Sequence, residues 1–175
     1  MRERLSASII AAGKPLPQRM QKNHLIGSSM NIFTNPNESA VKQLLSESGL
    51  PMADITTQHL QHFFGCSSDL KLEGLVGLEL YGEVALLRSL AVTAERRGWG
   101  LGSKLVEHAE GYAREKGVTS LYLLTTTAEA FFLRRGYARI PREDAPAAIK
   151  GTKEFSGICP VSSAFMVKHF KPISK

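Results

Sequence analysis

Three glycines at alternate positions, Gly98, Gly100 and Gly102, separate an apolar run from an amphipathic one. The apolar run, Val84–Val92, predicts a strand buried on both faces, and residues 100–116 carry apolar side chains at helical spacing. Glycine lets backbone amides approach a ligand without Cβ collisions, and the unpaired amides at the start of a helix attract anions. A buried strand, a glycine loop and a helix in this order predict a cradle for a pyrophosphate group. A merely flexible start to the helix is the alternative.

Two familiar phosphate-binding loops do not fit this spacing. A Walker A loop needs lysine and then serine or threonine after its last glycine, whereas Ser103 and Lys104 follow Gly102 in the reverse order. The dinucleotide fingerprint G-x-G-x-x-G would need glycine at position 103 or 105. The cradle therefore belongs to another class of anion-binding loop.

Arg88 is the charged residue in an otherwise apolar strand segment. Because burying an unpaired guanidinium is costly, it needs a partner. The sequence leaves two interpretations open: a structural ion pair with Glu79, or recognition of an anion in a substrate cleft. Arg142 is a second candidate for binding a substrate carboxylate or oxyanion.

His59, His62 and Cys66 are metal-ligand types close together in the sequence. Three such residues without a fourth ligand are more often ordinary surface or core residues, so no metal site is expected. Cys159 lies before Pro160 and has no base beside it in the sequence, which argues against a nucleophile.

The elements that must position these residues follow from local signals. We expect a first helix to begin near Pro36, with Asn35 as its cap, and to end at Gly49. A second, short helix is expected over 54–62. The other expected elements are strands near 63–67 or 69–72, at 75–81 and at 84–92, a helix over 100–116, a strand at 121–124, a helix over 128–135 and a final strand at 162–170.

An antiparallel meander followed by strand, helix, strand and helix predicts an α+β fold, a three-layer α/β/α sandwich around a mixed sheet. The length of 175 residues and the 43% hydrophobic content suit a single domain, expected over 30–175. Residues 1–29 carry five basic side chains against one acidic, a net of +4 out of the chain's +6, and are expected to form a disordered extension. Because the positive charge lies mostly in this extension, no nucleic-acid partner is expected.

Two cysteines provide no disulfide framework, which favours a reducing, cytoplasmic setting. No run approaches the roughly 18 apolar residues of a membrane-spanning helix, so no membrane partner is expected.

The stretch Arg97-Gly98-Trp99-Gly100-Leu101-Gly102 resembles the R-x-x-G-x-G segment of the GNAT superfamily of acetyl-CoA-dependent N-acetyltransferases. The strand LLRSLAV (86–92) before it and FFLRRGY (131–137) after it strengthen the resemblance, which covers about residues 30–170. More narrowly, 86–92, 121–137 and a tail with Ala145-Pro146 and Cys159-Pro160 resemble the small GNAT subfamily named for arsenic-resistance operons.

The resemblance implies a GNAT-like fold and acetyl-CoA as co-substrate. In the family, the strand equivalent to 89–92 bulges away from the next strand and pairs with the pantetheine arm, while amides of the glycine segment hold the pyrophosphate. The residues implied for the cofactor are Leu90, Ala91, Val92, Arg97, Gly98, Trp99, Gly100, Leu101, Gly102, Ser103, Thr125 and Phe132.

Two positions depart from the family pattern. Phe132 stands where members often have a tyrosine that acts as general acid, and Thr125 stands where an asparagine is common. Protonation of the leaving thiolate is therefore left to water, to Tyr137 or to a hydroxyl of residues 125–127.

The resulting hypothesis is transfer of acetyl from acetyl-CoA to a primary amine of a small molecule by direct attack. Because an amine arrives protonated, a base is needed, and Glu79, on the strand next to the cofactor strand, is the first candidate. Arg88 and Arg142 would bind a carboxylate of the substrate, an amino acid or, by the subfamily resemblance, an arsenic-bearing analogue. The alternatives are an acyl-CoA sensor or lapsed enzyme, and an acetyltransferase for protein N-termini or lysines. A homodimer is also left open.

Overall fold

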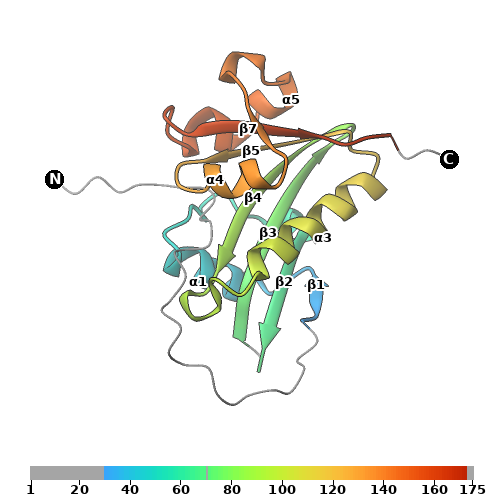
Figure 1. Ribbon diagram of the computed structural model, residues 1–175. Helices are drawn as coiled ribbons and strands as arrows, with labels where there is room; N and C mark the ends of the chain where they lie inside the picture. Colours follow the sequence, from blue (N-terminus) through green and yellow to red (C-terminus); the bar gives the residue numbers. More distant parts are fainter. Residues whose placement is uncertain (1–29, 70, 173–175) are drawn as a thin grey trace.

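A seven-stranded mixed sheet forms the centre of the fold, and helices cover both of its faces (Figure 1). The computed structural model describes residues 30–69 and 71–172, and the extension expected at 1–29 lies outside these ranges. The strand order is β1-β2-β3-β4-β5-β7-β6. This arrangement confirms the predicted three-layer sandwich.

The strands are β1 (Ile32–Thr34), β2 (Phe63–Ser68), β3 (Lys71–Tyr81), β4 (Val84–Val92), β5 (Ser120–Thr125), β6 (Ala138–Arg139) and β7 (Ala164–His169). The helices are α1 (Glu38–Glu47), α2 (Thr57–Leu60), α3 (Leu101–Glu115), α4 (Glu129–Arg134) and α5 (Ala147–Lys150). Two 3₁₀ turns, η1 (Ala94–Arg96) and η2 (Arg142–Asp144), and a π-helical turn, η3 (Glu154–Ile158), complete the described elements.

Strands β2, β3 and β4 form the expected antiparallel meander, and β5 lies parallel to β4. Parallel neighbours need a crossover connection, which α3 provides. In Figure 1, α3 crosses in front of β3 and β4, while β5 and β7 run across the upper part of the molecule. The sheet is therefore strongly twisted at the junction between β4 and β5.

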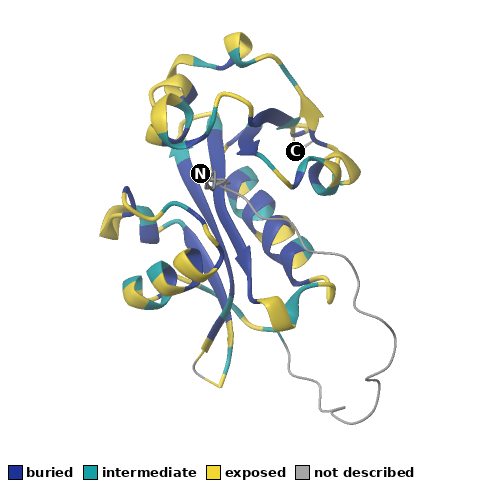
Figure 2. Ribbon diagram, turned by 90° about the vertical axis from the view of Figure 1, so that its left-hand side faces the viewer, coloured by how far each residue is buried: buried dark blue, intermediate teal, exposed yellow. Residues whose placement is uncertain are grey.

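The two faces of the sheet are packed differently. One face meets α3 and α4 in a single apolar cluster that includes Leu87 and Phe132. The other face carries two smaller clusters, one around Leu45 of α1 and one around Ile149 of α5. Figure 2 shows the buried strands and the buried inner side of α3 in dark blue. β3 and β4 lie between the two helical layers, so side chains on these strands can form a buried site.

The first helix begins later than expected. Asn37, not Asn35, is its N-cap, and the Asn37 side chain accepts hydrogen bonds from the amides of Ser39 and Ala40. Asn35 has a φ of 56°, a left-handed conformation that asparagine tolerates better than most residues. Pro36 therefore precedes the helix instead of opening it.

The second helix is shorter than expected, since α2 covers only Thr57–Leu60. Asp54, expected in that helix, lies in the loop before it and is buried. The strands expected near 63–67 or 69–72 correspond to β2 and to a longer β3, which begins at Lys71. β1, β6 and the turns between 142 and 158 were not predicted, because elements this short carry no period.

None of the helices in the described part of the chain combines the length and the apolar character that a bilayer crossing needs.

Candidate functional site

Strands β4 and β5 pair over their first residues and then separate. Their parallel register ends where Leu86 lies opposite Tyr122, although β4 continues to Val92 and β5 to Thr125. Within the described residues, the strand edges beyond this point have no pairing with each other. An opening of this kind can accept an extended ligand that pairs with the edges as a strand would.

A bulge in β4 accompanies the separation. Ser89 has a φ of 56°, which is uncommon for a residue other than glycine, and the register between β3 and β4 shifts between Leu75 and Gly77. Bulges bend the strand that carries them and increase its twist. The bulge expected at 89–92 is therefore present, and it turns β4 away from β5 where their pairing stops.

The glycine loop leads from the end of β4 to the start of α3. Gly98 and Gly100 have φ values of 80° and 81°, and a Cβ at either position would meet nothing within 4 Å. Gly102 lies in the first turn of α3, where a Cβ would touch Val92 at 3.8 Å. Gly100 is the N-cap of α3, and no side chain in the described ranges caps this helix. The open space and the exposed amides fit an anion such as a pyrophosphate.

Two arginines hold the backbone on either side of these glycines. Nε of Arg97 donates to the carbonyl of Val92 at 3.0 Å, and Nη2 of Arg135 donates to the carbonyl of Ser103 at 3.0 Å. Trp99, between them, is 70% exposed. The loop is thus fixed at both ends and presents an indole ring to whatever binds there.

Arg88 lies beside the bulge, with its side chain fully buried among carboxylates. Nη1 and Nη2 donate to the two carboxylate oxygens of Asp54 at 2.6 and 2.9 Å. Nη1 also donates to Glu79, and Nη2 lies 3.1 Å from Oε1 of Glu154. The ion pair with Glu79, one of the two interpretations that the sequence left open, is present. Asp54 and Glu154 are further partners that sequence reasoning missed.

The charges in this cluster support one another. Burial alone would raise the pKa of Asp54, but the hydrogen bonds and the charge of Arg88 hold it below its usual value. Burial would likewise lower the pKa of Arg88, whereas its three carboxylate partners raise it. Both groups therefore stay charged at neutral pH.

Glu79 lies at the level where β4 and β5 part. It pairs across β3 and β4 with Leu86, and it is 9% exposed. The hydroxyl of Tyr81 donates to its Oε2 at 2.5 Å, and Nε2 of His59 lies 3.9 Å from its Oε1. Burial and the hydrogen bond to Glu79 raise the pKa of Tyr81, so the tyrosine keeps its proton. Glu79 is thus an oriented carboxylate beside the opening.

The candidate metal ligands His59, His62 and Cys66 do not form a cluster. Nδ1 of His59 accepts a hydrogen bond from the amide of Thr56 at 3.1 Å, and Nδ1 of His62 lies 3.1 Å from the hydroxyl of Tyr112. Cys66 is buried within β2. In the residues that the structure describes, no group of three or more His, Cys, Asp or Glu side chains is arranged to hold a metal ion.

Phe132 and Thr125 both belong to the interior. Phe132 is fully buried and packs edge-on against Tyr137. The hydroxyl of Thr125 accepts a hydrogen bond from the amide of Ala128 at 2.9 Å. Tyr137 donates to Glu110 at 3.1 Å, and burial together with Glu110 raises the pKa of Tyr137 well above its usual value. Both hydroxyls therefore take part in structural hydrogen bonds.

Arg142 lies in η2. Its Nη2 donates to the carbonyl of Phe155 at 2.7 Å, and its guanidinium carbon lies 4.4 Å from the centre of the Phe155 ring. Arg88 and Arg142 thus contact adjacent residues of η3, Glu154 and Phe155. Their partners differ: carboxylates surround Arg88, whereas Arg142 bonds a backbone carbonyl and packs on an aromatic ring.

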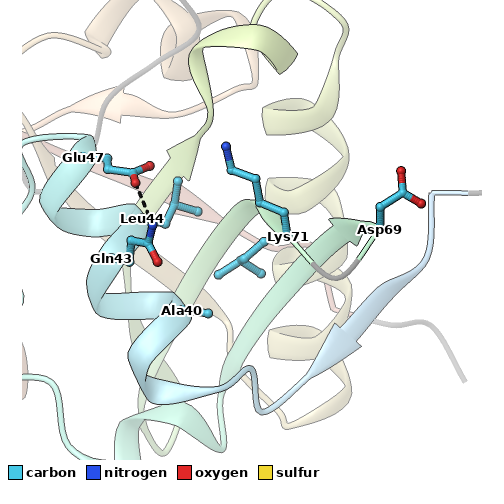
Figure 3. A pocket seen from close by; sticks show the side chains of 7 residues that line it. Ala40, Gln43, Leu44, Glu47, Asp69 and Lys71 are labelled. Atoms are coloured by element: carbon cyan, nitrogen blue, oxygen red, sulfur yellow. Dashed lines mark hydrogen bonds between the residues drawn. The ribbon is translucent and has the colours of Figure 1, made fainter.

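A separate groove lies between α1 and the start of β3 (Figure 3). Leu44 lines it from α1 and Lys71 from β3, while Gln43 and Glu47 hydrogen bond to each other at 3.0 Å. Along β3, the distance from Lys71 to Glu79 is roughly 26 Å for an extended strand. The groove is therefore not part of the site around Glu79.

Comparison with known proteins relates the chain to acetyltransferases. Residues 30–137 match the acetyltransferase (GNAT) family. The chain is 37% identical over 93 residues to an uncharacterized N-acetyltransferase of Chlorobaculum tepidum, a match covering 53% of this chain and 59% of the relative. It is 34% identical over 91 residues to an amino-acid acetyltransferase of Ralstonia nicotianae, covering 51% of this chain and 18% of the relative. The chain thus spans less than two thirds of either relative.

Solved structures share the fold. An N-acetylglutamate synthase from Neisseria gonorrhoeae, complexed with coenzyme A and N-acetyl-glutamate, superposes with a TM-score of 0.68 at 21% identity, covering 80% of this chain and 35% of that one. A GNAT acetyltransferase from Staphylococcus aureus superposes with a TM-score of 0.67 at 17% identity, covering 82% of this chain and 100% of that one. At these identities the likeness concerns the fold alone.

Removing the buried guanidinium should destabilise the protein strongly. Arg88→Met leaves three buried carboxylates without it, and the expected loss in the free energy of unfolding is about 3–5 kcal/mol, measured by urea unfolding at pH 7. Arg139→Met is the matched control, because Arg139 is 59% exposed and pairs with Glu129 at the surface. Its loss should cost less than about 1 kcal/mol. Equal effects of the two substitutions would contradict the importance of the cluster.

The cost of Arg88→Met should also depend on pH. The pKa of Asp54 is lower in the folded than in the unfolded chain, so its stabilisation is fully present above the unfolded value of about 3.9. It is lost as the pH falls through the folded value. The stability difference between wild type and Arg88→Met should therefore shrink between about pH 5 and pH 2. A difference that stays constant over this range would contradict the assignment.

Proposed function

Because the chain belongs to the acetyltransferase (GNAT) family, we propose that it transfers the acetyl group of acetyl-CoA to the primary amine of a small molecule. The observation that carries this proposal is the opening between β4 and β5. A glycine loop borders it at the end of β4, and the carboxylate of Glu79 lies at the level where it begins.

The residues around the opening suit acetyl-CoA. The edge of β4 at 90–92 offers backbone groups to the pantetheine arm, and the amides at 98–103 face its pyrophosphate. Acetyl-CoA supplies an activated thioester, so the protein has mainly to hold the amine near it. Direct attack then needs no covalent intermediate on the protein.

We assign the role of general base to Glu79. An amine reaches the site protonated and must lose a proton before it can attack. Arg88 and Tyr81 bind the two oxygens of Glu79 and fix their orientation, and each oxygen keeps a second lone pair. Glu79 can take the proton through such a lone pair, directly or through a water. In this proposal Arg88 is a positioning residue for Glu79 and not a ligand of the substrate.

The proposed acceptor is an amino acid or a close analogue. The Ralstonia relative is named for acetylation of amino acids, and the subfamily resemblance adds an arsenic-bearing amino-acid analogue. The second candidate function is an acyl-CoA sensor, favoured by the buried Phe132 where a tyrosine acid is often found.

A CoA-release assay separates these functions. Acetyl-CoA is offered with amino acids, an arsenic-bearing analogue, polyamines and peptides. We expect turnover with amino-acid-like amines. Binding of acetyl-CoA without turnover on any amine would favour the sensor, and a preference for peptides would favour a protein acetyltransferase.

The glycine loop can be tested before an acceptor is known. Acetyl-CoA at 100 times its Kd should stabilise the protein by about 2.7 kcal/mol and raise Tm by several degrees, whereas NAD should not. Gly102→Leu adds a bulky side chain beside Val92 in the first turn of α3, next to the amides proposed to bind the phosphates, so the shift should vanish. Gly111→Leu is the control on the same helix, where a Cβ meets nothing within 4 Å, and it should keep the shift. If acetyl-CoA raised the Tm of Gly102→Leu as much as that of wild type, the result would contradict a pyrophosphate site at the glycine loop.

Glu79→Gln tests the base. It keeps the size of the side chain but cannot accept the proton, so kcat should fall by about 10²–10⁴ while KM for acetyl-CoA stays within about threefold. Tyr81→Phe is the control, because it removes one hydrogen bond to Glu79 and leaves the carboxylate. Its kcat should stay within about tenfold of wild type. A kcat of Glu79→Gln close to wild type would show that another group is the base.

Phe132→Tyr tests for a missing acid. A thiol has a pKa near 8.5, so its thiolate needs only modest help in leaving, and kcat should change less than about tenfold. The added hydroxyl is buried, so Tm should fall. Phe131→Tyr, at the neighbouring and partly exposed position, controls for the added oxygen. A rise in kcat of about 100-fold or more for Phe132→Tyr would favour a lapsed enzyme or a sensor.

A further inference from the structure

A hollow of about 410 Å³ lies where η2 meets the start of β7, and Arg142, Ser163 and Phe165 help to line it. Ser163 directly precedes β7, and Phe165 lies within that strand. Phe165 belongs to the cluster around Ile149, on the face away from α3. The hollow therefore opens on the face of the sheet that carries Glu79 and not on the face covered by α3.

Two buried polar atoms of this hollow lack a partner. Within the described ranges, nothing hydrogen bonds to Oγ of Ser163 or to Nη1 of Arg142. Ser163 is only 4% exposed, so solvent does not readily satisfy its hydroxyl. The second terminal nitrogen of Arg142, Nη2, donates a hydrogen bond to the carbonyl of Phe155. Buried donors without acceptors are costly and rare in native proteins, so these two groups are candidates for binding a ligand.

The chemistry of the hollow favours an anion. A guanidinium and a hydroxyl both donate hydrogen bonds to carboxylates, and guanidinium geometry suits a carboxylate particularly well. Arg88 cannot play this part without losing a partner, since three carboxylates already surround it. Arg142 has one nitrogen to offer.

The hollow is also close to the opening. Ser163 precedes Ala164, which pairs with Thr125 at the end of β5 where β4 and β5 are apart. One strand, β5, lies between β7 and β4, so two spacings of about 4.8 Å put them about 10 Å apart where the strands pair and further apart beside the opening. Side chains and a small acceptor can bridge this distance together.

We propose that Arg142 and Ser163 bind a carboxylate of the amine acceptor. The inference rests on the proposed acetyl transfer and names its substrate class: amines that carry a carboxylate remote from the reacting nitrogen. Neutral amines and polyamines would lack this contact.

Binding of three nearly isosteric probes tests the subsite. L-glutamate, its side-chain amide L-glutamine and its α-amide isoglutamine are titrated by calorimetry into the full chain with CoA present. Wild type should bind L-glutamate and isoglutamine, which keep the carboxylate remote from the nitrogen, at least tenfold more tightly than L-glutamine, which lacks it. Arg142→Gln should abolish this ratio, and Ser163→Ala should reduce it about threefold. Lys150→Gln removes a nearby exposed charge and should leave the ratio unchanged.

Three results would overturn the inference. Wild type could show no preference for acid over amide or bind none of the probes. Arg142→Gln could retain the ratio and merely lower Tm, which would indicate a structural role through Phe155. Arg142→Gln could instead weaken the binding of CoA, which would indicate that the hollow binds the cofactor and not the acceptor. Carboxylate-dependent binding with no CoA release on any amine would contradict the proposed function and leave the subsite standing.

Discussion

Burial of the Arg88 guanidinium constrains the face of the sheet that lies away from α3. Such a group is stable in the interior only where carboxylates surround it. Asp54 comes from the loop before α2, Glu79 from β3 and Glu154 from η3, so three distant segments converge on one point of β4. An ionic centre thereby ties the α1 side of this face to the α5 side. Its consequence for the site is the fixed orientation of Glu79 beside the opening.

At the opening, β4 and β5 do not pair with each other, and core packing on the opposite face of the sheet stabilises them instead. Ser89 holds a left-handed conformation in the middle of a strand, which costs free energy unless the surroundings enforce it. On the opposite face, Leu87 and Leu90 of β4 and Leu123 of β5 belong to one continuous apolar cluster with α3. This shared core therefore keeps the two strands in place although they are apart. Their unpaired edges are available to a ligand because the core, and not their mutual pairing, keeps them in place.

The glycine loop and its flanking elements could be predicted from the sequence, whereas much of the ionic centre could not. Val84–Val92 is a continuous apolar run and α3 has a helical period, both of which are local signals, and the bulge came from the family resemblance. The partners of Arg88 leave no such local signal, because Asp54 is 34 residues away and Glu154 lies in a short turn without a period. Asp54 was even expected inside a helix. The usable hint was Arg88 itself, a charge in an apolar strand, which required partners and suggested Glu79 alone.

A crystal structure with bound acetyl-CoA tests most directly the central claim, that the β4–β5 opening holds the acetyl donor in front of a carboxylate fixed by Arg88. The pantetheine arm should lie between β4 and β5 and pair with the backbone at 90–92, with the pyrophosphate on the amides at 98–103. Glu79 should remain bound to Arg88 and lie within hydrogen-bond reach of the acetyl group, directly or through one water. CoA bound elsewhere, or Glu79 turned away from the acetyl group, would contradict the claim.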